Sequence, residues 1–469
     1  MPAEYKGLNE ECGIFGIWGH EHAVQMTYYG LHSLQHRGQE GTGIVVKNDQ
    51  HLVIHKGIGL LNDVFTKEKV KELVGNAAIG HVRYSTSGGT GYENVQPLLF
   101  HSHTGSLAIA HNGNLLNADQ LKLSLEKQGS IFQTNSDTEV LAHLIKRSVK
   151  TNCLVEKVKA ALNELVGAYA LLLLTENQMI VALDPKGFHP LALGRFGESY
   201  VVASETCAFD LIGASHVRDI EPGELLVISD VGVEVERFAP KESEAFCAME
   251  YVYFSRPDSI LSGVTVHTAR KEMGKILAQE APVDADIVVA VPDSGISAAI
   301  GYAEATNIPY EMGLIKNRYV GRTFIQPSQE LREQGVKMKL APVRGIVQGK
   351  RVVLIDDSLV RGTTSRRIVR MLFEAGAKEV HLRISSPVIQ HPCYYGVDFS
   401  TREELIAHRY SLEQICQEVG ATSLAYLSQS GLVKAIGRKN DGYCLACFNG
   451  DYPIKEGIAY GRSLQTCGC

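Results

Sequence analysis

The chain has 469 residues, of which 45% are hydrophobic and 21% are charged, and its formal net charge is −6. This length exceeds what a single hydrophobic core usually serves, so we expect two or three domains. The negative charge argues against non-specific binding to nucleic acid or an anionic membrane, and no apolar run is long enough to span a bilayer. Ten cysteines do not suggest a disulfide framework in a chain of this size, and no signal peptide precedes the first domain, so we expect a cytoplasmic protein.

The N-terminal half begins with eleven mostly polar residues and changes abruptly at Cys12, the first residue of CGIFG. Short alternating or apolar runs follow, and the last of them lie within residues 220–238. Few helical stretches interrupt them; the best are residues 23–33, 118–128, 138–148 and 154–165. This pattern predicts an α+β domain in which largely antiparallel sheets stack and helices lie outside.

Four polar clusters punctuate the strands of this half: HRGQEGTG at 36–43, HVRYSTSGG at 81–89, HNGNL at 111–115 and TNSDTE at 134–139. Each cluster alone is typical of a turn, and SDTE is also typical of a capped helix N-terminus. Together with Cys12 at the start of the domain, the clusters resemble the glutaminase domain of N-terminal-nucleophile amidotransferases. The resemblance implies the αββα fold of that family.

The same resemblance implies a role for each of five residues. Cys12 would be the thiol nucleophile that attacks the side-chain amide of glutamine. The side chain of Asn112 and the backbone N–H of Gly113 would form the oxyanion hole. Arg83 would bind the glutamine α-carboxylate, for which bidentate geometry suits arginine, and Asp137 would hold the α-ammonium group.

The first eleven residues are expected to be a propeptide. No residue near Cys12 in the sequence supplies a general base. Removal of residues 1–11 would free the α-amino group of Cys12, and an unperturbed α-amino pKa of about 7.7–8.0 suits that role.

From about Cys247 the pattern changes to buried strands that alternate with helices, as in DIVVAVPDSG before GISAAIGYAEAT and RVVLIDDSLV before TSRRIVRMLFEAGA. This alternation predicts an α/β domain whose parallel sheet is covered on both faces. We place one domain at residues 12–240, a second at 241–440, and an irregular Cys-rich segment at 441–469.

The motif VVLIDDSLVRGTTSRR at 352–367 places two carboxylates at the end of a buried strand, before a loop of small residues that opens a helix. Such a loop suits a phosphate, and adjacent carboxylates suit sugar hydroxyls or hydrated Mg²⁺. The motif resembles the phosphoribosyl pyrophosphate (PRPP) signature of type I phosphoribosyltransferases. This resemblance implies that Asp356 and Asp357 bind the ribose and help to place Mg²⁺. The PRPP-binding set would further include Ser358, Arg361, Gly362, Thr363 and Thr364, with residues 361–365 around the 5′-phosphate.

Two other segments fit a PRPP site. In VVAVPDSGISAA, a second strand ends before Ser294, which the resemblance places near the metal. The segment at 315–332 is either a solvated basic loop or a lid that closes over pyrophosphate. It carries Lys316, Arg318, Arg322 and Arg332, of which the first two are also candidates for contacts with PRPP and with regulatory nucleotides.

Four cysteines of the second half, Cys247, Cys393, Cys444 and Cys447, form a candidate ligand set. Their spacing does not distinguish zinc, an iron–sulfur cluster or unligated thiols. Some members of the glutamine PRPP amidotransferase family carry a [4Fe–4S] cluster on cysteines arranged this way, together with a short leader, and the resemblance implies both here. The cluster would be structural or regulatory, because neither half-reaction is a redox step. The cysteines expected to be buried without ligands are Cys153, Cys207 and Cys416, while Cys467 and Cys469 receive no role.

A glutaminase followed by a type I phosphoribosyltransferase is the domain order of the glutamine PRPP amidotransferase family. The resemblance implies a pentosyltransferase that makes 5-phosphoribosylamine, glutamate and pyrophosphate from PRPP, water and glutamine, in the first committed step of de novo purine biosynthesis. It also implies a homotetramer that purine nucleotides inhibit. The alternatives are a glutamine amidotransferase with another acceptor, a salvage phosphoribosyltransferase, and a non-catalytic sensor of PRPP or nucleotides.

Overall fold

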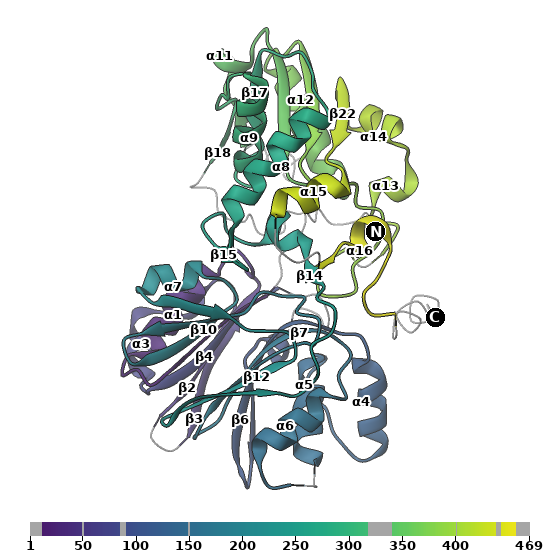
Figure 1. Cartoon of the computed structure of the whole chain (residues 1–469). Helices are drawn as coiled ribbons and strands as arrows, with labels where there is room; N and C mark the ends of the chain where they lie inside the picture. The colour runs from purple at the N-terminus through teal and green to yellow at the C-terminus, as the bar shows by residue number, and fades with distance from the viewer. Residues whose placement is uncertain are drawn as a thin grey trace.

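The computed structural model describes residues 12–48, 51–84, 91–148, 151–317, 340–399, 401–437 and 442–455. The N-terminal half forms a domain of stacked sheets, and the C-terminal half forms a second domain around a smaller sheet (Figure 1). Among the described helices, none combines the length and apolar composition that crossing a membrane requires.

The first sheet of the N-terminal domain has seven antiparallel strands in the order β11-β9-β10-β1-β4-β2-β3. The strand that follows Cys12 lies at its centre, so the expected nucleophile emerges from the middle of the sheet. The strands are β1 (Gly13–Trp18), β2 (Gly41–Lys47), β3 (Leu52–Ile58), β4 (Ala77–Arg83), β9 (Ala192–Phe196), β10 (Ser199–Ala203) and β11 (Ser215–Asp219).

The second sheet has six antiparallel strands in the order β13-β12-β8-β7-β6-β5. A core that includes Ile14 and Val45 from the first sheet and Leu172 from the second lies between the two sheets. The near-continuous apolar runs of the central strands follow from burial on both faces. The strands are β5 (Leu98–Ser102), β6 (Gly105–Leu115), β7 (Gly167–Leu174), β8 (Met179–Leu183), β12 (Glu224–Ser229) and β13 (Gly232–Arg237).

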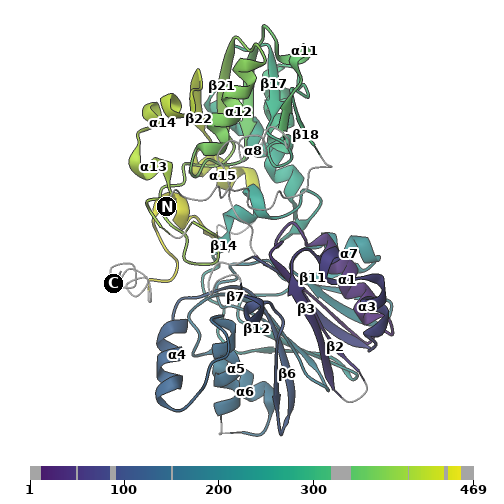
Figure 2. The ribbon, with the colours of Figure 1, turned by 180° about the vertical axis from the view of Figure 1, so that it is seen from behind.

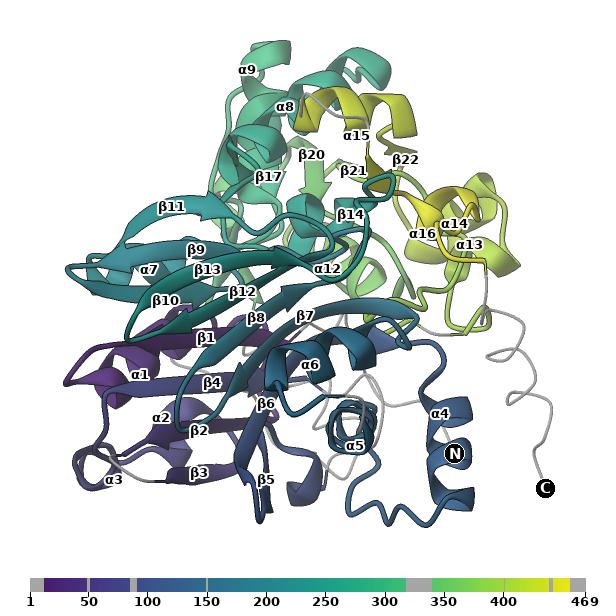
Figure 3. The ribbon, with the colours of Figure 1, turned by 60° about the horizontal axis from the view of Figure 1, so that its bottom comes forward.

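Helices cover the outer faces of both sheets and complete the predicted αββα layers (Figure 3). The helix predicted at 23–33 is confirmed, and the other three predicted helices end one to three residues early. On the first sheet lie α1 (Ala23–Ser33), α2 (Leu61–Val64), α3 (Lys67–Glu72) and α7 (Cys207–Ile212), and on the second lie α4 (Ala118–Lys127), α5 (Thr138–Arg147) and α6 (Leu154–Leu162).

The second domain contains the predicted parallel sheet, in the order β17-β20-β21-β22. Side chains alternate between its two faces: Val353 packs in the core with α8, α9 and α15, while Val352 and Leu354 pack in the core with α12 and α14. The elements are β17 (Ile287–Ala290), β20 (Arg351–Asp356), β21 (Glu379–Ile384), β22 (Ser423–Tyr426), α8 (Val266–Glu280), α9 (Ile296–Thr306), α12 (Thr363–Glu374), α14 (Leu412–Val419) and α15 (Gln429–Ile436).

Short elements complete the fold. They are η1 (Tyr92–Asn94), η2 (Glu250–Phe254), β14 (Phe246–Cys247), β15 (Ile260–Leu261), β16 (Val264–Thr265), β18 (Leu314–Lys316), β19 (Leu340–Pro342), α11 (Arg344–Val347), α13 (Ile406–Arg409), β23 (Tyr443–Cys444) and α16 (Ala446–Asn449). β14 lies where the two domains meet (Figure 2), and β23 pairs with it.

The prediction of an irregular C-terminal segment is wrong for residues 443–449. β23 pairs in parallel with β14, so that Cys444 stands opposite Cys247, and α16 follows directly. The sequence signal was weak because both strands have two residues, and the partner that orders β23 lies almost 200 positions earlier.

Candidate active sites

Cys12 stands immediately before β1 and is half-buried. Its Sγ lies 3.4 Å from the carbonyl oxygen of Tyr84, and its own carbonyl oxygen accepts a hydrogen bond of 3.0 Å from Nε of Arg37. Arg37 is fully buried and belongs to the HRGQ cluster. Its contact with Cys12 was not predicted, and membership of that cluster is its one signal in the sequence.

The two predicted oxyanion-hole residues are adjacent on β6. Asn112 is 1% exposed, and within the described part of the chain its buried Nδ2 has no hydrogen-bond partner. Gly113 has a φ of 141°, and a Cβ there would lie 2.1 Å from the carbonyl oxygen of Ala168, so only glycine fits. A buried amide donor with no acceptor is costly unless a ligand satisfies it, and the oxygen of a substrate would do so.

The predicted α-ammonium ligand, Asp137, stands at the N-cap of α5. Its Oδ2 accepts a 3.0 Å hydrogen bond from the backbone N–H of Leu115, at the end of β6. Burial acts to raise the pKa of Asp137, but nearby His111 and the hydrogen bond from Leu115 outweigh it and hold the pKa below its ordinary value. The group is therefore a carboxylate whose side chain is 10% exposed, as binding an ammonium group requires.

The two sheets bring these residues to one end of the domain. Arg83 ends β4 and is followed by Tyr84, whose carbonyl oxygen faces Cys12. On the same strand, His81 Nε2 makes a 3.1 Å hydrogen bond to the carbonyl oxygen of His111 on β6. Burial lowers the pKa of His81 to about 3, so its ring is neutral and Nε2 is the donor. This bond ties the strand that leads to Arg83 to the strand that carries Asn112.

The motif at 352–367 lines a cavity of about 190 Å³ in the second domain. β20 delivers Asp356 and Asp357 to its wall, and α12 begins at Thr363, so that backbone N–H groups of the first turn lie at the cavity. Gly362, with a φ of 76°, precedes the helix. The lining residues are Tyr253, Val291, Ser294 and residues 356–365, which include every predicted member of this motif.

The two carboxylates of this cavity are buried beside each other. Burial and then the neighbouring Asp357 raise the pKa of Asp356 well above its ordinary value. Burial also raises the pKa of Asp357, against the opposing effect of hydrogen bonds from Ser294 and Ser358. A divalent cation, or hydrogen bonds from the hydroxyls of a sugar, would stabilise the two carboxylates in this buried position.

Of the basic residues predicted to contact PRPP or form a lid, Arg361 and Lys316 lie in the described part of the chain. Arg361 forms an ion pair with Glu404, and Lys316 Nζ lies 2.7 Å from Oδ2 of Asp293. Lys316 is half-exposed at the end of β18. Arg318, Arg322 and Arg332 lie outside the described residues, as do residues 1–11 and the cysteines at 467 and 469.

The four candidate cluster cysteines, Cys247, Cys393, Cys444 and Cys447, line one small and mostly apolar cavity. Burial, and then the thiols of Cys444 and Cys393, raise the pKa of Cys447 well above its ordinary value. Within the described ranges, no three His, Cys, Asp or Glu side chains are grouped as ligands of one metal ion.

The remaining cysteines follow the prediction in part. Cys207 is buried and Cys416 is partly buried. The prediction for Cys153 is wrong, because this residue is exposed. It precedes α6, whose buried side chains begin only at Val158.

The comparisons with known proteins cover both domains. Residues 81–210 match the model of a glutamine amidotransferase domain, and residues 265–395 match that of a phosphoribosyl transferase domain. The amidophosphoribosyltransferase of Bacillus subtilis (strain 168) is 66% identical over 460 residues, covering 97% of this chain and 96% of its own length. That of Staphylococcus aureus (strain MRSA252) is 53% identical over 455 residues, covering 96% and 92%.

One solved structure is similar over almost its full length. It is the glutamine PRPP amidotransferase from B. subtilis complexed with ADP and GMP. It superposes with a TM-score of 0.90 at 65% sequence identity, covering 94% of this chain and 97% of the other.

Proposed function

The chain belongs to the amidophosphoribosyltransferase family, and from this premise we propose which of its residues carry each half of the reaction. The enzyme makes 5-phosphoribosylamine from PRPP and glutamine, with glutamate and pyrophosphate as the other products, at the start of purine biosynthesis. The observation that carries the residue assignment is the buried Asn112 amide, which has no partner in the described structure and stands beside Gly113.

In the glutaminase half, the α-amino group of Cys12 takes the thiol proton while Sγ attacks the side-chain carbonyl carbon of glutamine. Asn112 Nδ2 and the Gly113 N–H donate to the oxyanion that forms. The C–N bond then breaks, the α-ammonium group returns its proton to the leaving nitrogen, and ammonia departs. Water hydrolyses the resulting thioester to glutamate. Arg83 and Asp137 hold the α-carboxylate and α-ammonium group of the substrate throughout.

In the phosphoribosyltransferase half, the N-terminus of α12 and the hydroxyls of Thr363 and Thr364 bind the 5′-phosphate of PRPP. Asp356 and Asp357 bind the ribose hydroxyls. The Ser294 hydroxyl donates a hydrogen bond to Asp357, which supports these three residues as the place for a metal ion. Bound Mg²⁺ would neutralise charge on the departing pyrophosphate. Ammonia attacks C1 of the ribose as the bond between C1 and the pyrophosphate oxygen breaks, and the new amine releases one proton. Because bulk water would convert ammonia to ammonium, we propose that it passes between the sites through a shielded route.

The cavity that the four cysteines line supports a [4Fe–4S] cluster as part of the proposal. The donors that line the cavity are four thiols, as such clusters require, and the Cys447 thiol, which burial keeps neutral, would become a thiolate beside iron. Each iron of the cluster binds a different thiolate, which suits thiols placed around a cavity rather than around one point. The cluster would be structural or regulatory, because neither half-reaction is a redox step.

Several expectations from the sequence belong to this proposal as well. Residues 1–11 would be removed to free the amine of Cys12. Purine nucleotides would inhibit the enzyme, because the B. subtilis relative was solved with ADP and GMP, and Lys316 and Arg318 are candidate contacts. A homotetramer in the cytoplasm is the expected form.

Replacement of Cys12 by alanine tests the division of labour. We expect Cys12→Ala to lose glutamine-dependent synthesis of phosphoribosylamine and to keep ammonia-dependent synthesis. Intact mass and N-terminal sequencing of active enzyme test the propeptide. Active protein that retains residues 1–11 would refute the role of the Cys12 amine.

A further inference from the structure

A glutamate of the second domain reaches the arginine that holds Cys12. Glu250 lies on η2, and its two oxygens accept hydrogen bonds from both terminal nitrogens of Arg37, at 2.9 Å from Nη1 and 2.6 Å from Nη2. Both side chains are fully buried. The third donor of the guanidinium, Nε, is the one that meets the carbonyl oxygen of Cys12 at 3.0 Å. One planar group therefore joins Glu250 to the backbone of Cys12.

A second carboxylate, Glu205 of the first domain, also binds Arg37. We call Arg37 with Glu250 and Glu205 the Arg37 clamp. Glu205 Oε1 accepts a 2.8 Å bond from Nη1 of Arg37, and its other oxygen accepts bonds from Arg256 N at 2.8 Å and from the hydroxyl of Ser259 at 2.6 Å. Burial acts to raise the pKa of Glu205, but His36 and Arg37 outweigh it and lower the pKa to about 2. Glu205 is therefore ionised, and Arg37 keeps one charged partner even without Glu250.

The other side of Glu250 leads toward the PRPP cavity. Its Oε2 accepts a 2.6 Å hydrogen bond from the hydroxyl of Ser255. Arg270 donates to the carbonyl oxygens of Tyr251, at 2.8 Å, and Ser255, at 2.7 Å, so it holds the backbone of η2 at both ends. Arg270 also interacts electrostatically with Asp357, a carboxylate of the cavity.

We propose that Glu250 is a positioning residue for the glutaminase reaction, supplied by the phosphoribosyltransferase domain. Glu250 fixes the direction of the Arg37 guanidinium. Arg37 in turn fixes the carbonyl oxygen of Cys12. The thiol and the α-amino group of Cys12 are thereby held in place. A small displacement of a reacting group costs a large factor in rate. The orientation of the nucleophile therefore depends on the position of η2. This inference rests on the proposed role of Cys12 as the nucleophile.

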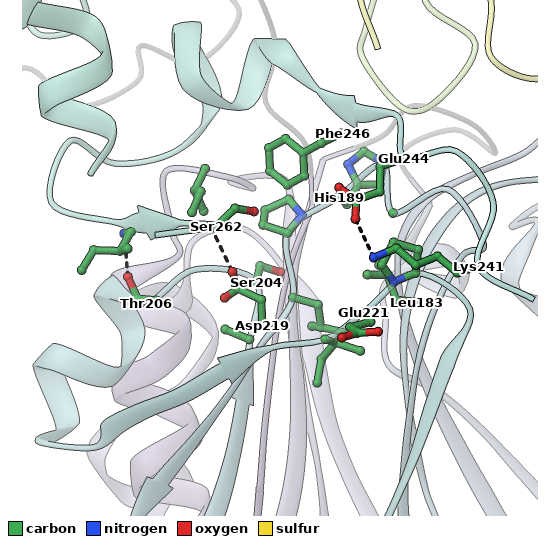
Figure 4. Close-up of a pocket in the computed structure, with 18 residues that line it drawn as sticks. Leu183, His189, Ser204, Thr206, Asp219, Glu221, Lys241, Glu244, Phe246 and Ser262 are labelled. Carbon is green, nitrogen blue, oxygen red and sulfur yellow. Dashed lines mark hydrogen bonds and ion pairs between the residues drawn. The ribbon is translucent and has the colours of Figure 1, made fainter. Parts of the chain in front are cut away.

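Docking of the two domains does not depend on Glu250 alone. The N–H of Ile260 donates to Oγ1 of Thr206 at 2.8 Å, and the N–H of Ser262 donates to Asp219 at 3.0 Å (Figure 4). These bonds cross the same interface without involving Arg37. A neutral substitution at 250 should therefore leave the domains docked and change only the clamp.

Glu250→Gln in the mature full-length enzyme tests the proposal. Glutamine has the size of glutamate but only one acceptor oxygen, so the bidentate contact is lost. We expect kcat for glutamine-dependent synthesis to fall by about 10- to 100-fold with little change in KM for glutamine. Ammonia-dependent synthesis should stay close to that of the unaltered enzyme, and alkylation of Cys12 by iodoacetamide should slow.

A matched control is Glu224→Gln, because Glu224 is also buried and also bidentate to an arginine, Arg218, at 2.7 and 3.0 Å. It has no contact with Arg37, so both activities should persist. Ser255→Ala, which removes one hydrogen bond from Glu250, should act in the same direction as Glu250→Gln but more weakly.

Equal loss of the two activities in Glu250→Gln would assign Glu250 to domain docking and overturn the proposal, and so would unchanged glutamine-dependent activity. Cys12→Ala separates failure of the premise from failure of this inference. If that variant kept glutamine-dependent synthesis, the nucleophile itself would be wrong.

Discussion

Removal of the Asn112 amide is the sharpest test of the glutaminase site. The side chain is 1% exposed, and its Nδ2 has no partner in the described structure. Asn112→Ala therefore breaks no bond of Nδ2 in the free enzyme, and the change should be felt mainly in the transition state. Loss of one oxyanion-hole donor costs about 2.7–4 kcal/mol in activation free energy, which corresponds to a fall of about 10²–10³-fold in kcat.

The assay compares glutamine-dependent and ammonia-dependent formation of phosphoribosylamine in the same preparation. We expect the first to fall by that factor, with KM for glutamine nearly constant, and the second to be unchanged. Asn117→Ala is the control: it removes hydrogen bonds to Glu164 and Val166, at 2.9 and 3.0 Å, and should lower stability but spare both activities. If kcat of Asn112→Ala fell by less than about tenfold, the oxyanion role of Asn112 would be refuted.

Three further predictions follow from the same geometry. The folded-state pKa of Asp137 is lowered, so its charge is lost only as pH falls through that value; Asp137→Asn should raise KM for glutamine by the same factor across about pH 5–8. An effect that vanished toward pH 5 would contradict this. Asp357→Asn should abolish glutamine- and ammonia-dependent synthesis alike, while glutamine hydrolysis measured without PRPP persists. Anaerobically purified enzyme should contain iron and sulfide and absorb visible light; Cys447→Ser should lose all three signals, whereas Cys416→Ser keeps them. Colourless, iron-free and fully active protein would exclude the cluster.

The Arg37 clamp also bears on how the two reactions are coordinated. Glu205, from the first domain, accepts bonds from Arg256 and Ser259 of the second, while Glu250 of the second domain accepts from Arg37 of the first. Each domain thus supplies hydrogen-bond donors to a buried carboxylate of the other domain. Because leaving either carboxylate unpaired would be costly, the two domains are expected to hold a defined relative position around Cys12.

Local pattern in the sequence determined much of this protein. Apolar runs and helical periodicity located most of the elements, because these depend on neighbours a few positions apart. That Asp356 and Asp357 line a cavity was predictable because they stand at the C-terminal end of a buried parallel strand, where such cavities form. Cys12 stood out because a polar segment ends where a buried strand begins.

The tertiary structure decided what depends on distant partners. Arg37 and Glu250 are 213 positions apart, and no local pattern links them. The cavity lined by four cysteines, the pairing of Cys247 with Cys444 and the exposure of Cys153 likewise follow from packing. The physical reason is the same in each case. Local sequence selects helix or strand, but whether a charge is buried and which group neutralises it depend on how separate elements pack.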